Sequence, residues 1–200
     1  MNLDKNNYEF AVPLFERIDE LLKHKDVIVA IEGGSASGKT TLSAVLGTIY
    51  DCTILHMDDF FLRPEQRTPE RYEEIGGNID RERFMEEILI PLKAKKTLNY
   101  RKFDCTTMTL CPGIPVIPKK LTVIEGVYSM HPAFSDYYDI SVFLDISSDL
   151  QKKRIAKRNT KEMFERFYKE WIPLEEVYFA HTKTKQRSDF PIVIKKSSCE

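Results

Sequence analysis

The sequence predicts an α/β fold built around a parallel sheet, and three observations favour it. Short apolar runs typical of buried strands alternate along the chain with helical segments. A glycine-rich loop joins the first of these runs directly to a helix. The length of 200 residues matches one domain, since domains typically have roughly 100–200 residues. In such a sheet, ligands bind at the carboxyl ends of the strands.

The first half of the chain is expected to contain two helices and two strands. Apolar residues with a 3.6-residue period predict an amphipathic helix over 8–25. The β-branched run 27–31 predicts the first strand, and 41–50 predicts the helix after the glycine-rich loop. A second apolar run at 53–57 predicts a strand that ends at a pair of aspartates.

The second half continues the alternation of helices and strands. The segment 97–120 has three prolines in its second half, so we expect a short hairpin and loop there rather than a core element. Trp171, Tyr178 and Phe179 are interpreted as core residues of a helix. The remaining expected elements are a helix at 80–92, strands at 121–124, 140–144 and 192–194, and helices at 149–158 and 169–182.

The composition limits the kinds of partner. With 30 Lys and Arg against 31 Asp and Glu, the formal net charge of −1 argues against a basic surface for nucleic acid or an anionic membrane. No apolar run approaches the roughly 18 residues of a membrane span. The polar start does not resemble a secretory signal, and the four cysteines lack disulfide or zinc spacing. We therefore expect a cytoplasmic protein with no nucleic-acid or membrane partner.

The glycine-rich segment 33–40 matches the phosphate-loop pattern G-x-x-x-x-G-K-[ST] in full. Its glycines let backbone N–H groups converge on phosphate oxygens, and the helix that follows adds its positive end. Lys39 is expected to reach the β- and γ-phosphates, and the Thr40 hydroxyl to bind Mg²⁺. The pattern thus predicts ATP or another nucleoside triphosphate, with Mg²⁺, in a P-loop NTPase three-layer sandwich. The residues expected to bind the nucleotide are Gly33, Gly34, Ser35, Ala36, Ser37, Gly38, Lys39, Thr40 and Thr41.

Carboxylates follow the next two strands. Asp58 and Asp59 end one strand and Glu125 ends another, so the sheet is expected to bring them beside the phosphate loop. One aspartate there can accept the proton of an acceptor hydroxyl and help to hold Mg²⁺, and Glu125 can anchor metal-bound water. Alternatively, Asp58 and Asp59 cap a helix or lie in a solvated turn. The guanine-reading N-K-x-D stretch and the transporter L-S-G-G-Q stretch are absent, so neither a GTPase nor a transporter ATPase is supported.

Several motifs, in order, resemble the uridine kinase, nicotinamide riboside kinase and phosphoribulokinase group of P-loop kinases. They are Gly33 to Thr40, Asp58-Asp59-Phe60-Phe61, Asn78-Ile79-Asp80, Ile124-Glu125-Gly126-Val127 and the helix from Arg154 to Arg158. The resemblance covers about residues 26–194 and implies a single kinase domain over 1–200 with a short lid at about 159–170. It also implies an ATP- and Mg²⁺-dependent transfer of the γ-phosphoryl group to a hydroxyl of a nucleoside or nucleoside-like small molecule.

The resemblance also implies roles for individual residues. Asp58 is similar to the catalytic base and metal-associated residue of the group, and Asp80 to the carboxylate that holds ribose hydroxyls. Asp80 can also cap the helix after it. Phe60 and Phe61 are similar to residues that line the nucleoside side, or are core aromatics, and Tyr100 begins the stretch matching the base-reading segment. Where uridine kinases have a base-reading histidine, this chain has about Met108, so the base is left open.

The lid side of the predicted site depends on basic residues. Arg154 and Arg158, four residues apart, share one helical face and can clamp the transferring phosphoryl group, or else belong to a solvated basic face. Related kinases are often dimers or tetramers, so a homo-oligomer is a candidate assembly. The alternative function is a nucleotide-binding regulatory protein that keeps the phosphate loop but phosphorylates no acceptor.

Overall fold

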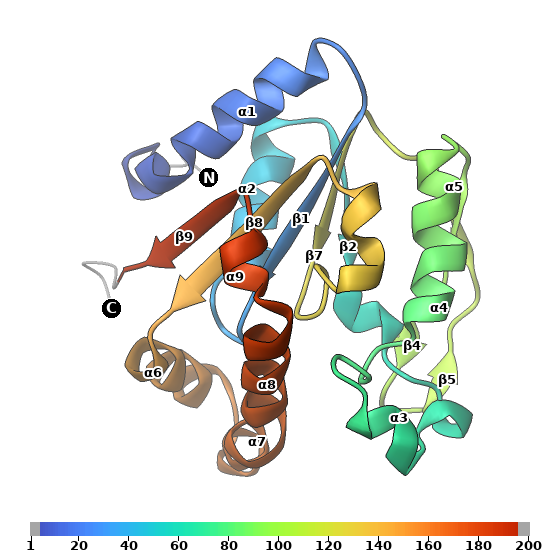
Figure 1. The fold of residues 1–200 in the computed structure, drawn as a ribbon, viewed down its shortest axis with the longest axis vertical. Helices are drawn as coiled ribbons and strands as arrows, with labels where there is room; N and C mark the ends of the chain where they lie inside the picture. The colour runs from blue at the N-terminus through green and yellow to red at the C-terminus, as the bar shows by residue number, and fades with distance from the viewer. Residues whose placement is uncertain (1–4, 196–200) are drawn as a thin grey trace.

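Five parallel strands form the centre of the protein in this computed structural model, which describes residues 5–195. In spatial order the strands are β2 (Cys52–His56), β7 (Leu121–Glu125), β1 (Val27–Gly33), β8 (Ile140–Ile146) and β9 (Phe190–Ile194). They run in one direction through the middle of the molecule (Figure 1). The predicted parallel sheet is therefore confirmed.

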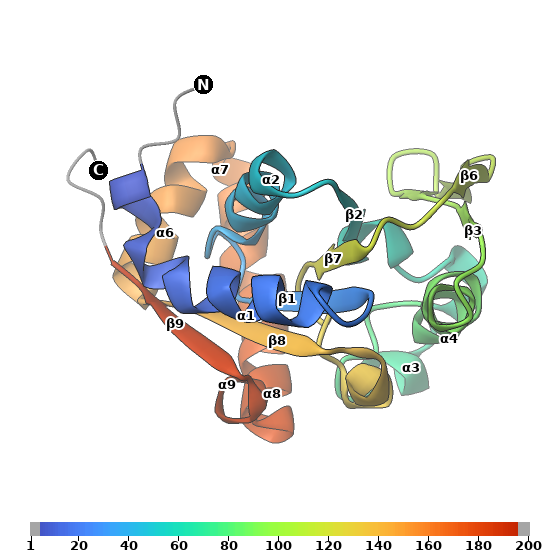
Figure 2. The same cartoon turned by 90° about the horizontal axis from the view of Figure 1, so that it is seen from above.

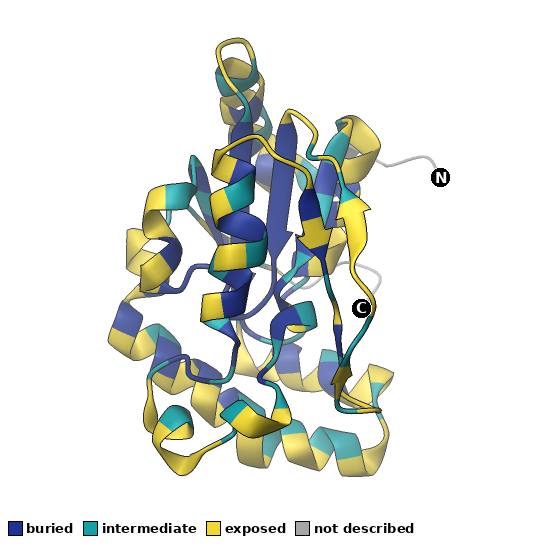
Figure 3. Cartoon of the chain, turned by 90° about the vertical axis from the view of Figure 1, so that its right-hand side faces the viewer, coloured by how far each residue is buried: buried dark blue, intermediate teal, exposed yellow. Residues whose placement is uncertain are grey.

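Helices cover both faces of the sheet and give three layers. On one face, α1 (Val12–Leu22) and α2 (Lys39–Ile49) pack against the side chains of Val29 and Ile31. On the other face, Ile28 contacts a second apolar cluster formed with α4 (Arg81–Phe84), η5 (Pro132–Tyr137) and α8 (Ile172–Thr182). Seen from above, α2 and α8 lie on opposite sides of β1 and β8 (Figure 2). Strands β1 and β7 are buried throughout, while the outer faces of the helices are exposed (Figure 3).

The register of the central strands determines where the site lies. Ile31 and His56 both pair with Glu125, and Gly33 pairs with Leu144 on the other side of β1. The carboxyl ends of β2, β7 and β1 therefore finish at one level. The segments that follow these strands diverge from a common edge, as the sequence predicts.

Two helices differ from the expected ranges. The segment expected as one helix over 8–25 is a 3-10 turn η1 (Lys5–Ala11) followed by α1, with Pro13 in the first turn, where its missing N–H costs little. The helix expected at 80–92 is observed as α4, η4 (Met85–Leu89) and α5 (Ile90–Lys93). Its centre is a π-helical turn in which the Ile90 N–H donates to the Met85 carbonyl.

The segment 97–120 contributes more to the core than the sequence suggests. It forms two small antiparallel pairs, β3 (Leu98–Tyr100) with β6 (Ile114–Val116) and β4 (Phe103–Asp104) with β5 (Thr109–Leu110), which confirms a hairpin. Leu98, Tyr100 and Phe103 are nevertheless buried. The prolines lie in and around the exposed strand β6, whereas the buried apolar residues lie earlier in the segment, on β3 and β4.

The predicted lid is helical. After α6 (Ser148–Arg158), α7 (Lys161–Arg166) and η6 (Phe167–Trp171) lead directly into α8, so helix begins at 161 rather than 169. Thr160 caps it, because its side chain accepts a hydrogen bond from the Met163 N–H. The remaining short elements are η2 (Met57–Phe60), η3 (Pro64–Gln66), α3 (Pro69–Glu73) and α9 (Thr184–Arg187). Within 5–195, no helix combines the length and apolarity needed to cross a bilayer.

Candidate active site

A cleft of about 1910 Å³ opens at the carboxyl ends of the strands. One wall is the phosphate loop with the start of α2, and the facing wall includes Asp58. A third wall comes from α6 to α8, which lie across from α3 in Figure 1. The predicted residues that line this cleft are Ser35, Ala36, Ser37, Gly38, Lys39, Thr40, Thr41, Asp58, Phe61, Glu125, Arg154 and Arg158.

The phosphate loop has the geometry of an anion site. Gly38 has φ +105° and begins α2, and no side chain caps the first N–H groups of that helix. The Ser37 hydroxyl is buried and has no hydrogen-bond partner. Lys39 is buried too, and within residues 5–195 its Nζ donates to two loop carbonyls, at 2.8 Å to Gly33 and 3.1 Å to Gly34. These unsatisfied donors and this cation suit the phosphates of a nucleotide.

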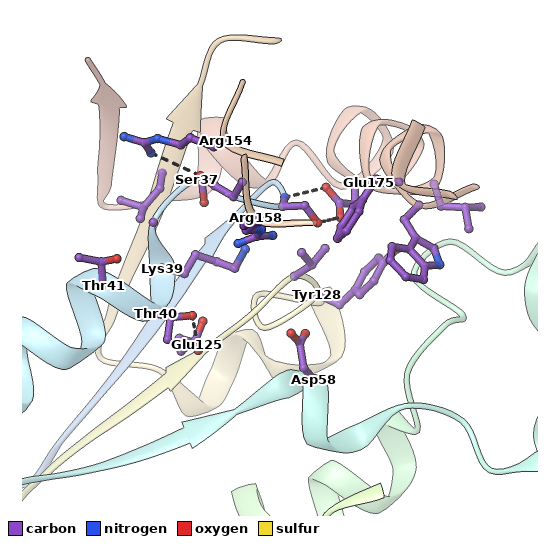
Figure 4. A pocket seen from close by; sticks show the side chains of 18 of the residues that line it. Ser37, Lys39, Thr40, Thr41, Asp58, Glu125, Tyr128, Arg154, Arg158 and Glu175 are labelled. Carbon is purple, nitrogen blue, oxygen red and sulfur yellow. Dashed lines mark hydrogen bonds between the residues drawn. The ribbon is translucent and has the colours of Figure 1, made fainter. Parts of the chain in front are cut away.

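The two aspartates after β2 have different environments. The Asp59 carboxylate accepts a hydrogen bond from the Tyr100 hydroxyl and lies 3.3 Å from the Lys102 ammonium group. Asp58 is exposed to the cleft, and its carboxylate points toward the phosphate loop (Figure 4). The cleft walls partly desolvate the Asp58 carboxylate, which raises its pKa. The Lys39 charge opposes this rise, and the Glu125 charge adds to it. Asp58 is therefore the aspartate that a substrate can reach.

Glu125 connects the loop to β2. Its Oε1 accepts a hydrogen bond from the Thr40 hydroxyl at 3.1 Å and lies 2.7 Å from His56 Nδ1. That contact raises the pKa of His56. His56 is not among the site residues predicted from the sequence, although its place at the end of β2, two positions before Asp58, was the available signal.

The residues proposed for Mg²⁺ fit a metal shared with a nucleotide. No group of three or more His, Cys, Asp or Glu side chains within 5–195 is arranged to hold a metal alone. Thr40 and Glu125 are hydrogen-bonded to each other, and Asp58 faces the same space (Figure 4). Mg²⁺ typically takes one or two carboxylates, with phosphates and water as the other ligands. The donor set therefore suits Mg²⁺ bound together with phosphates.

Two further carboxylates were missed by sequence reasoning. Glu175 on α8 is buried, and its carboxylate accepts hydrogen bonds from the Ser35 N–H at 2.9 Å and from the Ser35 hydroxyl. Burial raises its pKa, and these hydrogen bonds oppose the rise. Glu32 is fully buried at the end of β1 and accepts hydrogen bonds from the N–H groups of Tyr128 at 2.7 Å and Met130 at 2.8 Å. Burial raises its pKa to about 7.

The predicted lid arginines lie on the third wall. Arg154 Nη1 donates to the Ala36 carbonyl at 3.4 Å, and the Arg158 guanidinium lies over the Phe167 ring at 5.8 Å. Figure 4 shows both side chains near the phosphate loop. Trp171, expected in the core, lines the cleft instead, because the helix that carries it forms this wall. Tyr178 is buried as expected.

Three of the predicted acceptor residues lie behind the wall rather than in it. Phe60 is fully buried against Phe84, with ring centroids 4.9 Å apart, and Tyr100 is buried with its hydroxyl on Asp59. Of the two alternatives left open for the aromatic pair, Phe60 is a core aromatic and Phe61 lines the cleft, whereas Tyr100, predicted to bind the substrate, does not line it.

Asp80 is the third of these residues and is 1% exposed. It caps α4 by accepting from the Arg83 N–H at 3.2 Å, and its Oδ2 lies 3.1 Å from Arg63 Nε and 3.3 Å from Arg83 Nε. The oxygens of this carboxylate therefore already interact with groups of the protein. The helix-cap role is confirmed, and the structure does not place Asp80 in the cleft.

Comparisons with known proteins agree with this geometry. The model of the "Phosphoribulokinase / Uridine kinase family" matches residues 28–170. A uridine kinase from Bacillus cytotoxicus is 30% identical over 148 residues, which cover 70% of this chain and 69% of the relative. A solved structure of a possible uridine kinase from Bacillus stearothermophilus has a TM-score of 0.63 at 22% identity and covers 92% of this chain and 100% of its own. A candidate fructose transport system kinase from Silicibacter sp. TM1040 has a TM-score of 0.69 at 20% identity, with 92% and 98% covered.

Proposed function

The chain belongs to the phosphoribulokinase and uridine kinase family, and from this premise we propose that it is a small-molecule kinase that uses ATP and Mg²⁺. The γ-phosphoryl group goes to a hydroxyl of a nucleoside or nucleoside-like acceptor. One observation carries the proposal: a phosphate loop with open donors faces a solvent-exposed carboxylate, Asp58, across a cleft.

The loop holds the phosphoryl donor. The N–H groups at the start of α2 and the Ser37 hydroxyl bind phosphate oxygens, and Lys39 exchanges its two loop carbonyls for phosphate oxygens. Thr40, Asp58 and Glu125 are the ligands proposed for Mg²⁺. When bound, Mg²⁺ neutralises charge on the phosphates.

Asp58 is the proposed catalytic base. A carboxylate with a raised pKa accepts a proton more readily; desolvation raises the pKa of Asp58, and the Lys39 charge opposes that rise. Glu125 is held beside the loop by its contacts with Thr40 and with His56 Nδ1, which lies 2.7 Å away. Asp58 is thus proposed both as the base and as a ligand of Mg²⁺, while Glu125 serves the metal alone.

The third wall supplies the lid. Residues 159–170 close over the cleft as part of the single domain, and Arg154 or Arg158 stabilises charge on the transferring phosphoryl group. Arg154 already lies beside the loop at Ala36, which supports its inclusion.

The acceptor class rests on relatives named uridine kinase. Met108 lines the cleft and offers no hydrogen bond that would read a particular base. The proposal therefore stops at a nucleoside-like hydroxyl compound, and a sugar acceptor belongs in any test.

The test is ADP release from Mg²⁺–ATP with a panel of nucleosides, vitamin ribosides, pantothenate and sugars. Release stimulated by one acceptor class supports the kinase. Tight ATP binding with no stimulation by any acceptor would instead favour the regulatory nucleotide-binding protein.

A further inference from the structure

One cation on the acceptor wall has no role in the function proposed above. Arg67 lines the cleft on the same wall as Tyr72, Asn78 and Met108, away from the phosphate loop. It is half-buried, so it contacts both the protein and the cleft.

Two contacts fix the orientation of Arg67. Its Nε donates to the Leu62 carbonyl at 3.0 Å, and its guanidinium lies over the Phe103 ring at 5.6 Å from the centroid. A guanidinium held at Nε and across one face presents its terminal nitrogens as a planar pair of donors, and the Cys105 side chain lies within hydrogen-bonding range of Arg67.

Arg67 also differs from the other arginines of this region. Each of four neighbours has a carboxylate within ion-pair distance: Arg63 with Asp80, Arg71 with Glu82, Arg83 with Asp80 and Arg101 with Glu87. No acidic side chain of the described residues 5–195 lies within 4.0 Å of Arg67. A cation anchored at a cleft wall without a counter-charge suits an anionic ligand.

The neighbouring Cys105 relates Arg67 to the reacting end of the cleft. Its side chain also lines the cleft, and the charges of both Arg67 and Asp58 act on it. Arg67 and Asp58 line the same cleft and form no ion pair with each other, so one small molecule can contact both residues.

We propose that the acceptor carries an anionic group, a carboxylate or a phosphate, which Arg67 binds while the acceptor hydroxyl lies at Asp58. Arg67 is then a specificity-determining residue for the acceptor. The inference rests on the proposed function, because it places the second end of the same substrate. The phosphates of ATP do not need Arg67, since the loop and Lys39 on the opposite wall bind them.

The first test compares acceptors that differ in one charge. Uridine 3′-phosphate with uridine, pantothenate with panthenol, and glycerate with glycerol are assayed by ADP release. In wild type, the anionic member of the productive pair has a kcat/KM higher by about tenfold or more, and Arg67→Gln removes this preference. Arg67→Lys retains part of it, because the charge stays while the planar fork is lost. Arg17→Gln, an exposed arginine on α1, is the matched control and keeps the preference.

Two results would overturn the proposal. One is equal use of the charged and neutral members by wild type, and the other is an equal loss for both members in Arg67→Gln.

The second test does not require phosphoryl transfer, so its outcome is separate from that of the proposed function. With Mg²⁺–ADP saturating the loop, inorganic phosphate is titrated while iodoacetamide alkylates the exposed Cys105, followed by peptide mass spectrometry. Phosphate slows alkylation of Cys105 several-fold in wild type and not in Arg67→Gln, and Cys111 serves as the internal reference.

These two assays separate the possible failures. If no acceptor stimulates ADP release but phosphate protects Cys105 through Arg67, the kinase proposal fails and the anion site stands. If phosphate at tens of millimolar gives no protection in wild type, Arg67 binds no free anion and the inference is wrong.

Discussion

The two walls of the cleft are built in different ways. The phosphate loop presents mainly backbone N–H groups, a lysine and an unpartnered serine hydroxyl, all within nine consecutive residues. The acceptor wall is assembled from segments before and after the helix 81–93, with side chains such as Phe61 and Arg67 lining the cleft and Phe60 and Asp80 buried behind them. A site built from the backbone of one short segment can be predicted from the sequence motif of that segment. A site made of side chains from several segments depends on how those segments pack.

The largest expected effect comes from removing the proposed base, Asp58, which lies on the wall that faces the phosphate loop. Asp58→Asn removes the proposed base while preserving shape, so turnover should fall by about 10²–10⁴-fold. Nucleotide affinity, measured by calorimetry, should be largely kept. The matched control is Asp59→Asn, because Asp59 already interacts with Tyr100 and Lys102, and it should lose less turnover. Wild-type turnover in Asp58→Asn would remove Asp58 from the role of base.

Adjacent phenylalanines on the acceptor wall allow a direct comparison of inward and outward positions. Phe60→Ala should lower the free energy of unfolding by about 3–5 kcal/mol, because it leaves a cavity between Phe84 and Tyr100. Phe61→Ala should cost about 1 kcal/mol and mainly raise KM for the acceptor. Urea denaturation and steady-state kinetics on both variants check this. Equal loss of stability in the two would contradict the assignment of Phe60 to the core.

Behind both walls, Glu32 should make stability depend on pH. Its pKa is raised from 4.5 to about 7 in the folded protein, so between these values the folded state binds more protons than the unfolded state. The free energy of unfolding should therefore fall as pH rises through this window, by up to about 1.4 kcal/mol per unit. Glu32→Gln should flatten that slope in urea titrations at pH 5 to 8. An unchanged slope would assign the pH dependence to another group.

The smallest effect is expected at Ser37 in the phosphate loop. Ser37→Ala deletes a hydroxyl that has no partner in the protein, so stability without nucleotide should not decrease. ATP affinity should weaken by about 0.5–1.5 kcal/mol, the contribution of one hydrogen bond. Ser43→Ala is the contrasting variant, because its hydroxyl donates to the Thr40 carbonyl at 3.0 Å: stability should fall and affinity should not. Thermal shifts with and without Mg²⁺–ATP distinguish the two patterns.

The sequence alone determined the sheet, the phosphate loop and the segment ends that carry Asp58 and Glu125. Each follows from local pattern, because strand runs, glycine spacing and the residue after a strand are set within a few positions. In a parallel sheet, strand ends must meet, so the facing of Lys39, Asp58 and Glu125 was also foreseeable.

Only the tertiary structure decided which polar and aromatic side chains face the cleft. The Tyr100 hydroxyl donates a hydrogen bond to Asp59, which leaves Asp58 as the exposed aspartate. Asp80 forms ion pairs with Arg63 and Arg83. Glu175 reaches Ser35 across 140 positions of sequence. A one-dimensional pattern does not contain such pairings, because a buried carboxylate is retained only where packing supplies donors for it. Arg67 is the opposite case: packing places the Leu62 carbonyl and the Phe103 ring against its guanidinium, but no carboxylate of the described residues.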